Sequence, residues 1–256
     1  MLLHLSDLHF GTQRQECLDA IQRFCQQYQP EVIVISGDLT QRARFHEFYQ
    51  CKQFLQLLGI PYFVVPGNHD IPLYHLLNRA FRPFHYYELF FGDLEQQLET
   101  EHYYLVGVNT VRPYFHTKAV ISKQQIGQVE VQLQQAPANK LLTLVSHQPF
   151  YTAEHEHHHR SDCPALAEQA IKQWGHHGLK VLLHGHFHLS AVYDFNQHYQ
   201  LGLTHGVYEV HAGTGCSNRL YKQLTNSFNV IYPDATVEHY DFSDQEQEFI
   251  LRTSIG

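Results

Sequence analysis

The sequence predicts an α/β fold in which several strands end at one shared site. Up to residue 188, short apolar runs typical of strands alternate with longer segments of helical period. Five of the apolar runs end directly in residues that bind metal ions. In an open α/β sheet, ligands bind in the crevice outside the carboxyl ends of the strands. We therefore expect these five ends to converge on one site.

The predicted strands and helices follow one another in regular order. The strand runs that precede metal-binding residues are Met1–Leu5, Val32–Ile35, Tyr62–Val65, Leu141–Val145 and Lys180–Leu183. Between them, apolar residues recur at helical spacing, with polar residues on the opposite face. The predicted helices are Gln15–Tyr28, Phe45–Leu58, Lys123–Gln135 and Ala165–Gly175, with a mostly helical, aromatic region at Ile71–Leu98.

Beyond His188 the pattern changes to strands. The strands expected there are Ser190–Phe195, Tyr208–His211, Asn229–Tyr232 and Thr236–Phe242. Turns are expected near Asn196–Gln197 and Pro233–Asp234, where turn-forming residues separate the apolar runs. The order of elements predicts βαβ units first and then a tail that adds a second sheet, packed on the first.

Length and composition predict a single domain over residues 1–256, since 43% apolar content is enough for a sizeable core. The formal net charge of −8 argues against a broad basic surface, so we expect no stable nucleic-acid binding. Five scattered cysteines without CxxC spacing fit a reduced cytoplasm. The sequence contains no signal-peptide pattern and no apolar stretch of membrane-spanning length. We expect a cytoplasmic protein without membrane attachment.

Taken singly, several polar residues at the strand ends have ordinary structural explanations. Asp7 and His9 are two residues apart, so in an extended segment both would face one metal ion. Asp38 follows a glycine, and it could either cap the next helix or bridge two metal ions. His147 alone would more often be structural. His184 lies inside its strand run, and we expect a buried, hydrogen-bonded role for it.

Two longer runs are more informative. In the segment 66–70 (PGNHD), the proline and glycine indicate a turn, and three polar side chains follow in a row. In the segment 185–188 (GHFH), the two histidines of an extended chain would point to one side. Together with the earlier residues, the blocks in chain order are DxH, GD, GNHD, H and GHxH.

This combination of blocks, from Asp7 to His188, resembles the calcineurin-like metallophosphoesterase family. The segments 37–40 (GDLT) and 64–72 (VVPGNHDIP) look most like the bacterial class III cyclic-nucleotide phosphodiesterases. The resemblance implies a four-layer α/β/β/α sandwich of two mixed sheets flanked by helices, with the metal site at strand ends. The strand-rich tail is consistent with the second sheet of that family.

The resemblance also implies roles for individual residues. One metal ion would be held by Asp7, His9 and His188, the other by Asn68, His147 and His186, with Asp38 bridging the two. His69 would contact the phosphate and protonate the leaving oxygen, and Asp70 would orient His69. The mixed nitrogen and oxygen donors admit manganese, iron, zinc or cobalt, and we expect manganese or iron.

The implied activity is metal-dependent hydrolysis of a small phosphodiester by a hydroxide that bridges the two metal ions. Candidate substrates include 3',5'-cyclic nucleotides such as cyclic AMP. A glycerophosphodiesterase, a phosphomonoesterase or a nuclease of the same family are alternatives, and a metal-free scaffold is a further one from a different class. The expected partner is the small substrate, and a homodimer remains open.

The chain departs from the family pattern in the segment 147–150 (HQPF), where many relatives have two adjacent histidines and two prolines. This leaves His147 intact but alters the wall of the pocket. The segment 155–160 (HEHHHR) is either a solvated loop or a lid over the site. The segment 213–219, which ends in Arg219, is either a turn between strands or an approach to the substrate.

Overall fold

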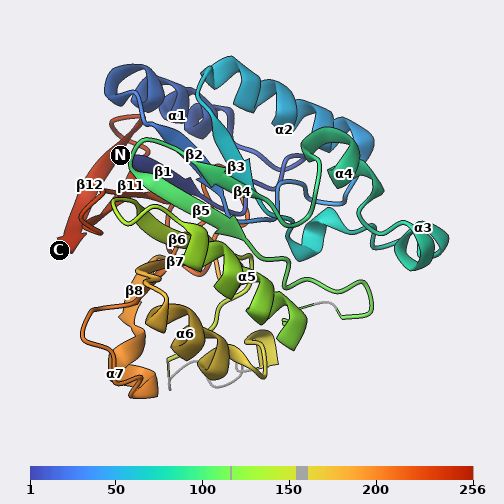
Figure 1. The fold of residues 1–256 in the computed structure, drawn as a ribbon. Coiled ribbons are helices and arrows are strands. Elements are labelled where there is room, and N and C mark those ends of the chain that lie inside the picture. The colour runs from blue at the N-terminus through green and yellow to red at the C-terminus, as the bar shows by residue number, and fades with distance from the viewer. Residues whose placement is uncertain (116, 154–160, 256) are drawn as a thin grey trace.

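The computed structural model describes residues 1–115, 117–153 and 161–255. Two mixed sheets lie face to face at the centre of the molecule, and helices cover their outer faces (Figure 1). Helices α1 (Gln15–Tyr28) and α2 (Phe45–Leu58) cover one side, while α5 (Lys123–Gln135) and α6 (Ala167–His176) cover the other. The predicted arrangement of two sheets between helical layers is confirmed.

The first sheet has the strand order β12-β11-β10-β1-β2-β3. Its strands are β1 (Leu2–Leu5), β2 (Val32–Ile35), β3 (Tyr62–Val64), β10 (Ser227–Ile231), β11 (Val237–Ser243) and β12 (Glu248–Ile255). Strands β1, β2 and β3 run parallel, with Leu2 opposite Val32 and Ile33 opposite Tyr62. The other neighbours are antiparallel. The parallel part of this sheet therefore ends at one edge with three strand ends side by side.

The second sheet has the order β4-β5-β6-β7-β9-β8. Its strands are β4 (Gln97–Glu99), β5 (Tyr103–Gly107), β6 (Leu141–Val145), β7 (Val181–His184), β8 (Ala191–Asp194) and β9 (Tyr208–His211). The four strands β5, β6, β7 and β9 run parallel, and β4 and β8 are antiparallel edges. The ends of β6 and β7 thus complete the set of five strand ends.

Alternate residues of the strands enter different cores. Leu3 and Leu5 of β1 pack with α1 and α2, whereas Leu2 packs between the two sheets. In the second sheet Leu182 faces α5 and α6, and Leu183 lies between the sheets. These buried runs read as continuous apolar stretches because both faces of a parallel sheet are covered.

The remaining helices are short. Between β3 and β4 lie the 3-10 turn η1 (Asn68–Asp70) and the helices α3 (Leu76–Phe81) and α4 (His85–Phe91). Helix α4 buries Tyr87 and Phe91 beside α2, so most of this aromatic region belongs to the core rather than to a free surface. Helix α3 stands out from the body at the edge of the molecule (Figure 1).

The structure corrects three expectations for the chain beyond β7. The tail does not form the second sheet by itself: β8 and β9 join the second sheet, whereas β10, β11 and β12 extend the first. The expected turn at Asn196–Gln197 is instead the helix α7 (Phe195–Tyr199), because the Asp194 carboxylate accepts from the amide of Asn196 and caps it. Strand β12 was not predicted, and neither were β4 and β5 earlier in the chain.

The segment 155–160, expected to be either a solvated loop or a lid, lies outside the described residues. Among the helices that the structure does describe, none has both the length and the apolar character needed to cross a bilayer.

Candidate metal centre

The centre forms where the five strand ends meet. Asp7 and His9 follow β1, Asp38 follows β2, and Asn68 follows β3 at the start of η1. From the second sheet, His147 follows β6, while His186 and His188 follow β7. The two sheets pack against each other, so residues 179 positions apart in the sequence come into contact. All seven expected ligands lie in this one region.

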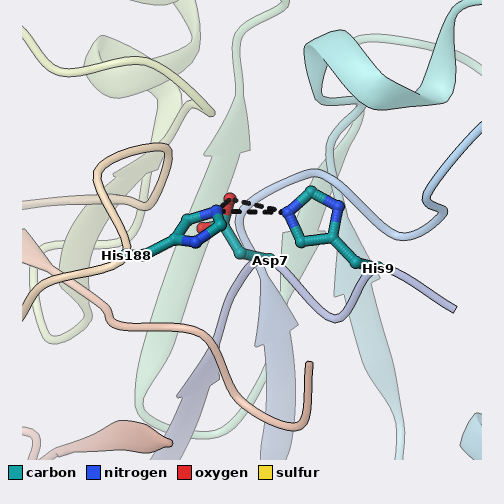
Figure 2. A group of neighbouring side chains, drawn as sticks. All are labelled: Asp7, His9 and His188. Carbon is teal, nitrogen blue, oxygen red and sulfur yellow. Dashed lines mark hydrogen bonds and ion pairs between the residues drawn. The ribbon is translucent and has the colours of Figure 1, made fainter. Parts of the chain in front are cut away.

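The first group consists of Asp7, His9 and His188 (Figure 2). The Nε2 atoms of His9 and His188 are 3.1 Å apart. The Oδ1 atom of Asp7 lies 3.2 Å from Nε2 of His188 and 3.7 Å from Nε2 of His9. Asp7 and His9 are fully buried. Three potential donor atoms therefore converge from two sheets.

The second group lies beside the first. Nε2 of His147 is 3.0 Å from Oδ1 of Asn68 and 3.3 Å from Nδ1 of His186. Asp38 stands between the groups, because one carboxylate oxygen is 3.4 Å from His147 and the other is 3.6 Å from His9. A carboxylate in this place can bind one metal ion with each oxygen.

Three of the four histidines are held as metal-binding histidines usually are, with one nitrogen in the cluster and the other on an oxygen acceptor. Nδ1 of His147 is 2.9 Å from the Ser36 carbonyl oxygen, and Nδ1 of His188 is 2.5 Å from that of Arg219. Each of these bonds leaves the Nε2 lone pair directed at the cluster. For His186 the outer partner is Asp162, whose carboxylate is 3.5 Å from Nε2.

The buried carboxylates of the centre are also compatible with a bound cation. Burial and then the charge of Asp7 raise the pKa of Asp38 to about 7. Burial alone would raise the pKa of Asp7 too, but His188 and the other histidines bring it well below its usual value. In the described part of the chain, Asp7 Oδ1, which faces His9 and His188, is buried without a hydrogen-bond partner. A buried carboxylate oxygen of this kind is accommodated by a metal ion.

The backbone of the ligands is strained rather than extended. Five expected ligands have a positive φ: Asp7 (51°), His9 (44°), Asp38 (50°), His186 (71°) and His188 (55°). Non-glycine residues adopt this left-handed region at a cost, and such strain gathers at functional sites. The expectation that Asp7 and His9, and likewise His186 and His188, share one side of an extended segment was therefore wrong. They meet because each turns sharply away at the end of its strand.

Close backbone contact accompanies these turns. A Cβ atom at Gly67 would lie 2.1 Å from the backbone nitrogen of Asp38 and 2.1 Å from its Oδ1 atom. Glycine at position 67 therefore lets η1, which bears Asn68, approach Asp38. The turn predicted at segment 66–70 thus needs glycine because a larger side chain would clash with Asp38.

His69 and Asp70 are placed differently from each other. His69 lines the cleft at the centre, and its Nδ1 is 3.0 Å from the carbonyl oxygen of Gln41. The Asp70 carboxylate accepts from the backbone nitrogens of Leu39, Thr40 and Gly67. Asp70 thus stabilises the turn of the backbone. This differs from the expectation that it orients the ring of His69, whose Nδ1 contacts Gln41.

The cleft over the centre has a volume of about 440 Å³. Asp38, Asn68, His186 and His188 contribute to its floor. Its walls include residues that sequence reasoning passed over or left open: Thr117, Asp162, Phe187, Arg219 and Tyr221.

Arg219 is close enough to act in the cleft. Its Nη1 atom lies 3.0 Å from Nε2 of His69 and 3.1 Å from Oε1 of Gln41. Of the two explanations for the segment 213–219, the structure favours an approach to the site. No pattern in the sequence pointed to Asp162 or Tyr221, because neither belongs to a motif or follows a predicted strand.

The sequence of this chain is similar to those of known phosphoesterases. Residues 1–190 match the family model of calcineurin-like phosphoesterases. A probable glycerophosphodiester phosphodiesterase GpdQ of Arcobacter nitrofigilis is 26% identical over 123 residues, 47% of this chain and 42% of the relative. The GpdQ of Enterobacter lignolyticus is 31% identical over 81 residues, 27% of this chain and 29% of the relative. The matched regions thus span less than half the length of these curated relatives.

Solved structures with the same fold include enzymes and a protein described as an anchor. The purple acid phosphatase PPD1 of yellow lupin (Lupinus luteus) has a TM-score of 0.71 at 11% identity, covering 100% of this chain and 53% of its own. A dimetal phosphatase of Danio rerio has a TM-score of 0.61 at 11% identity, covering 98% of each chain. GAP50, the anchor in the inner membrane complex of Plasmodium, has a TM-score of 0.59 at 13% identity, covering 99% of this chain and 87% of its own. On the sequence match over residues 1–190, the chain belongs to the calcineurin-like phosphoesterase family.

Proposed function

We propose that this protein is a dinuclear-metal phosphodiesterase that hydrolyses a small phosphodiester. The observation that supports it most directly is the place of Asp38, which stands between two groups of donor atoms at the floor of one cleft. Asp7, His9 and His188 would hold one ion, and Asn68, His147 and His186 the other. When bound, the two ions would supply an activated water and neutralise charge on the phosphoryl oxygens.

The donor set supports ions that accept both nitrogen and oxygen. Histidine nitrogens predominate, with carboxylate and amide oxygens completing the two groups. Such a set suits manganese, iron, zinc or cobalt, and we propose manganese or iron. Metal analysis of the protein purified without chelators tests this choice.

His69 is the proposed proton donor to the leaving oxygen. Without substrate, the pKa of His69 is lowered to about 3, chiefly by burial and also by the charge of Arg219, while the hydrogen bond to Gln41 acts in the opposite direction. A phosphate bound between His69 and Arg219 would bring negative charge to both groups. Because an opposite charge favours the protonated imidazole, the substrate itself would raise the pKa of His69 toward the working range.

Arg219 is the proposed contact for a non-bridging phosphate oxygen. The guanidinium faces the cleft beside His69, and guanidinium groups bind phosphate through charge-assisted hydrogen bonds. A single guanidinium in the cleft can attract an anionic phosphate even though the net charge of the protein is −8. It favours a small anionic substrate over a long nucleic acid, which needs a broad basic surface.

Two classes of small diester remain as candidates. The aromatic rings of Phe187 and Tyr221 line the cleft, which favours a cyclic nucleotide, because a base can stack on an aromatic side chain. The relatives named GpdQ favour a glycerophosphodiester. Phosphomonoesters and longer nucleic acids are the remaining alternatives.

A parallel assay distinguishes these candidates. The manganese-loaded protein would be tested on bis(p-nitrophenyl) phosphate, p-nitrophenyl phosphate, cyclic AMP and a glycerophosphodiester, with Asp38→Asn as the blank. Asp93→Asn, at an exposed aspartate, is the matched control. Turnover of diesters that disappears only in Asp38→Asn would support the proposal. Turnover of the monoester alone would contradict the phosphodiesterase assignment, and inactivity with two ions bound would contradict an enzymatic function on these substrates.

The remaining proposals concern the cellular location and the oligomeric state of the protein. Cys17, Cys25, Cys51 and Cys216 are buried thiols, and burial raises the pKa of Cys17 and Cys25 to about 12. Buried, protonated thiols support the proposal of a reducing cytoplasmic location. A homodimer remains a proposal to be tested by the mass of the protein in solution.

A further inference from the structure

A second group of buried histidine and carboxylate side chains lies outside the cleft. His184 ends β7, and Glu209 and His211 belong to the neighbouring strand β9. In the parallel register His184 is opposite His211, and Leu182 is opposite Glu209. Since alternate residues of a strand share a face, the three side chains project from the same face of the sheet. All three are 0% exposed.

The donor atoms of this group converge. Nε2 of His184 is 3.3 Å from one carboxylate oxygen of Glu209, and Nε2 of His211 is 3.4 Å from the other. One donor atom from each residue lies within 4.8 Å of the other two. In a tetrahedral zinc site with bonds of about 2.0 to 2.1 Å, neighbouring ligand atoms are about 3.3 Å apart. Each histidine lies at this distance from a different oxygen of Glu209, so the carboxylate can bind the same cation as either ring.

Several polar atoms of the group make no hydrogen bond. Within the described residues, Nε2 of His184, Oε2 of Glu209 and both ring nitrogens of His211 are buried without a hydrogen bond. Buried polar atoms are nearly always satisfied, so four orphaned atoms in one place indicate a binding site for a water molecule or an ion. Three of the four are the potential donor atoms themselves.

The ring orientation of His184 suits metal binding. Nδ1 of His184 is 3.0 Å from the Gly185 carbonyl oxygen, and a hydrogen bond there leaves the Nε2 lone pair facing Glu209. Nε2 of His211 is buried without a hydrogen bond and faces the other oxygen of Glu209, so it is also open to a cation.

We propose that His184, Glu209 and His211 bind an additional divalent cation, of which zinc is the best fit. Two imidazoles and one carboxylate are common ligands of zinc, and a water molecule would complete a four-coordinate shell. The group is separate from the dinuclear centre and does not depend on the proposed phosphodiesterase activity. Its complete burial excludes substrate, so the cation has a structural role.

The contacts of Glu209 indicate what the cation would stabilise. The Oε1 atom of Glu209 accepts from the backbone nitrogens of Phe150 and Tyr151, at 2.6 and 3.3 Å. This segment follows His147, a proposed ligand of the dinuclear centre. A cation bound by Glu209 would therefore connect β7, β9 and the segment after β6.

The competing explanation is a proton shared among the three side chains. Burial raises the pKa of Glu209 to about 7, so a protonated carboxyl could donate to one histidine without any metal. Metal content separates the two explanations, because a metal site formed by these three side chains adds one ion per chain, whereas a shared proton adds none.

The first experiment counts metal ions per chain by mass spectrometry in protein purified without chelators. Glu209→Gln should contain one zinc ion fewer than the native chain, although glutamine still offers an oxygen to the amides of Phe150 and Tyr151. His4→Gln, at another fully buried histidine that bonds to Ser36, is the matched control and should keep the native content. Equal zinc content in the native chain and in Glu209→Gln would overturn the proposal.

A second experiment isolates the new site. In a chain with Asp38→Asn and His188→Asn, which weaken the dinuclear centre, zinc should still bind and should raise the melting temperature. Adding His211→Asn should weaken zinc binding by more than about 100-fold, because even the outer partners of ligands contribute 10- to 100-fold. Cobalt in place of zinc should give the intense visible absorption of four-coordinate cobalt, and His211→Asn should remove it. Zinc binding and cobalt absorption that are unchanged by His211→Asn would overturn the proposal, and circular dichroism verifies that each variant is folded.

Discussion

The two groups of buried histidines and carboxylates stand on different kinds of backbone. At the dinuclear centre, five of the seven expected ligands have a positive φ and follow the ends of strands, and the centre opens to a cleft. In the second group, His184, Glu209 and His211 lie within the paired strands β7 and β9 and are fully buried. The same residue types are thus presented once by strained turns and once by regular strands.

This difference separates two uses of metal-binding residues. Strained turns at strand ends place side chains where a substrate can reach them, and the surrounding structure must hold the strain. Regular strands hold side chains rigidly but face a covered core, so a cation there can contribute to stability and not to turnover. If this comparison is right, substitutions in the second group should leave turnover intact. Substitutions in the dinuclear centre should leave the stabilising cation of the second group in place.

The largest expected effect is a reciprocal loss in two variants. Asp38→Asn should lower phosphodiester turnover by more than about 10⁴-fold, as happens when a catalytic unit loses one member. It should keep the zinc of the second group. Glu209→Gln should lose that zinc while it keeps both ions of the cleft. Kinetics and metal analysis on the same preparations check the pair, and loss of all metal in either variant would break the comparison.

The sequence could predict those features that depend on residues close together along the chain, and not those that depend on residues far apart. The ligands were recognisable because each block lies directly after an apolar run, which is local information. Helices α1 and α2 also have the predicted bounds, since helical periodicity is local. The pairing of β10 with β1 joins residues more than 220 positions apart, as Leu3 and Val230 show, and no local pattern reveals it.

The second group shows the same limit at a smaller scale. His184 was expected to be buried and hydrogen-bonded, and it is buried with Nδ1 on the Gly185 carbonyl. Its partners Glu209 and His211 depend on the parallel register of β7 and β9, across a connection that contains β8 and α7. The positive φ angles were also beyond the sequence, because Asp and His adopt both extended and left-handed conformations.

His69 gives the next largest expected effect. His69→Asn should lower kcat by about 10²- to 10³-fold on a diester with a poor leaving group, in the range that a general acid contributes. On bis(p-nitrophenyl) phosphate, whose leaving group needs no proton, the loss should be much smaller. His85→Asn, at an exposed histidine, is the control. Equal losses on the two diesters would contradict the role of proton donor.

Arg219 should have a smaller effect, mainly on binding. Arg219→Gln removes the cation beside His69, and it should raise KM by about 10- to 100-fold, since hydrogen bonds to charged groups contribute about 1.5 to 3 kcal/mol. Arg252→Gln, at an exposed arginine that pairs with Asp241, should leave KM unchanged. An unchanged KM in Arg219→Gln would show that the phosphate lies elsewhere in the cleft.

The smallest expected effect compares two glycines and tests the strained backbone directly. In Gly67→Ala the new methyl group would meet the backbone nitrogen of Asp38 at 2.1 Å, so the turn must shift. We expect a loss of about 1 to 3 kcal/mol in the free energy of unfolding, the usual cost of overpacking. Gly127 lies in helix α5 with nothing within 4 Å of a Cβ atom, so Gly127→Ala should instead stabilise by about 0.5 to 1 kcal/mol. Denaturant unfolding measures both. If Gly67→Ala were as stable as the native chain and kept its metal ions, the close approach of η1 to Asp38 would not be needed to build the centre.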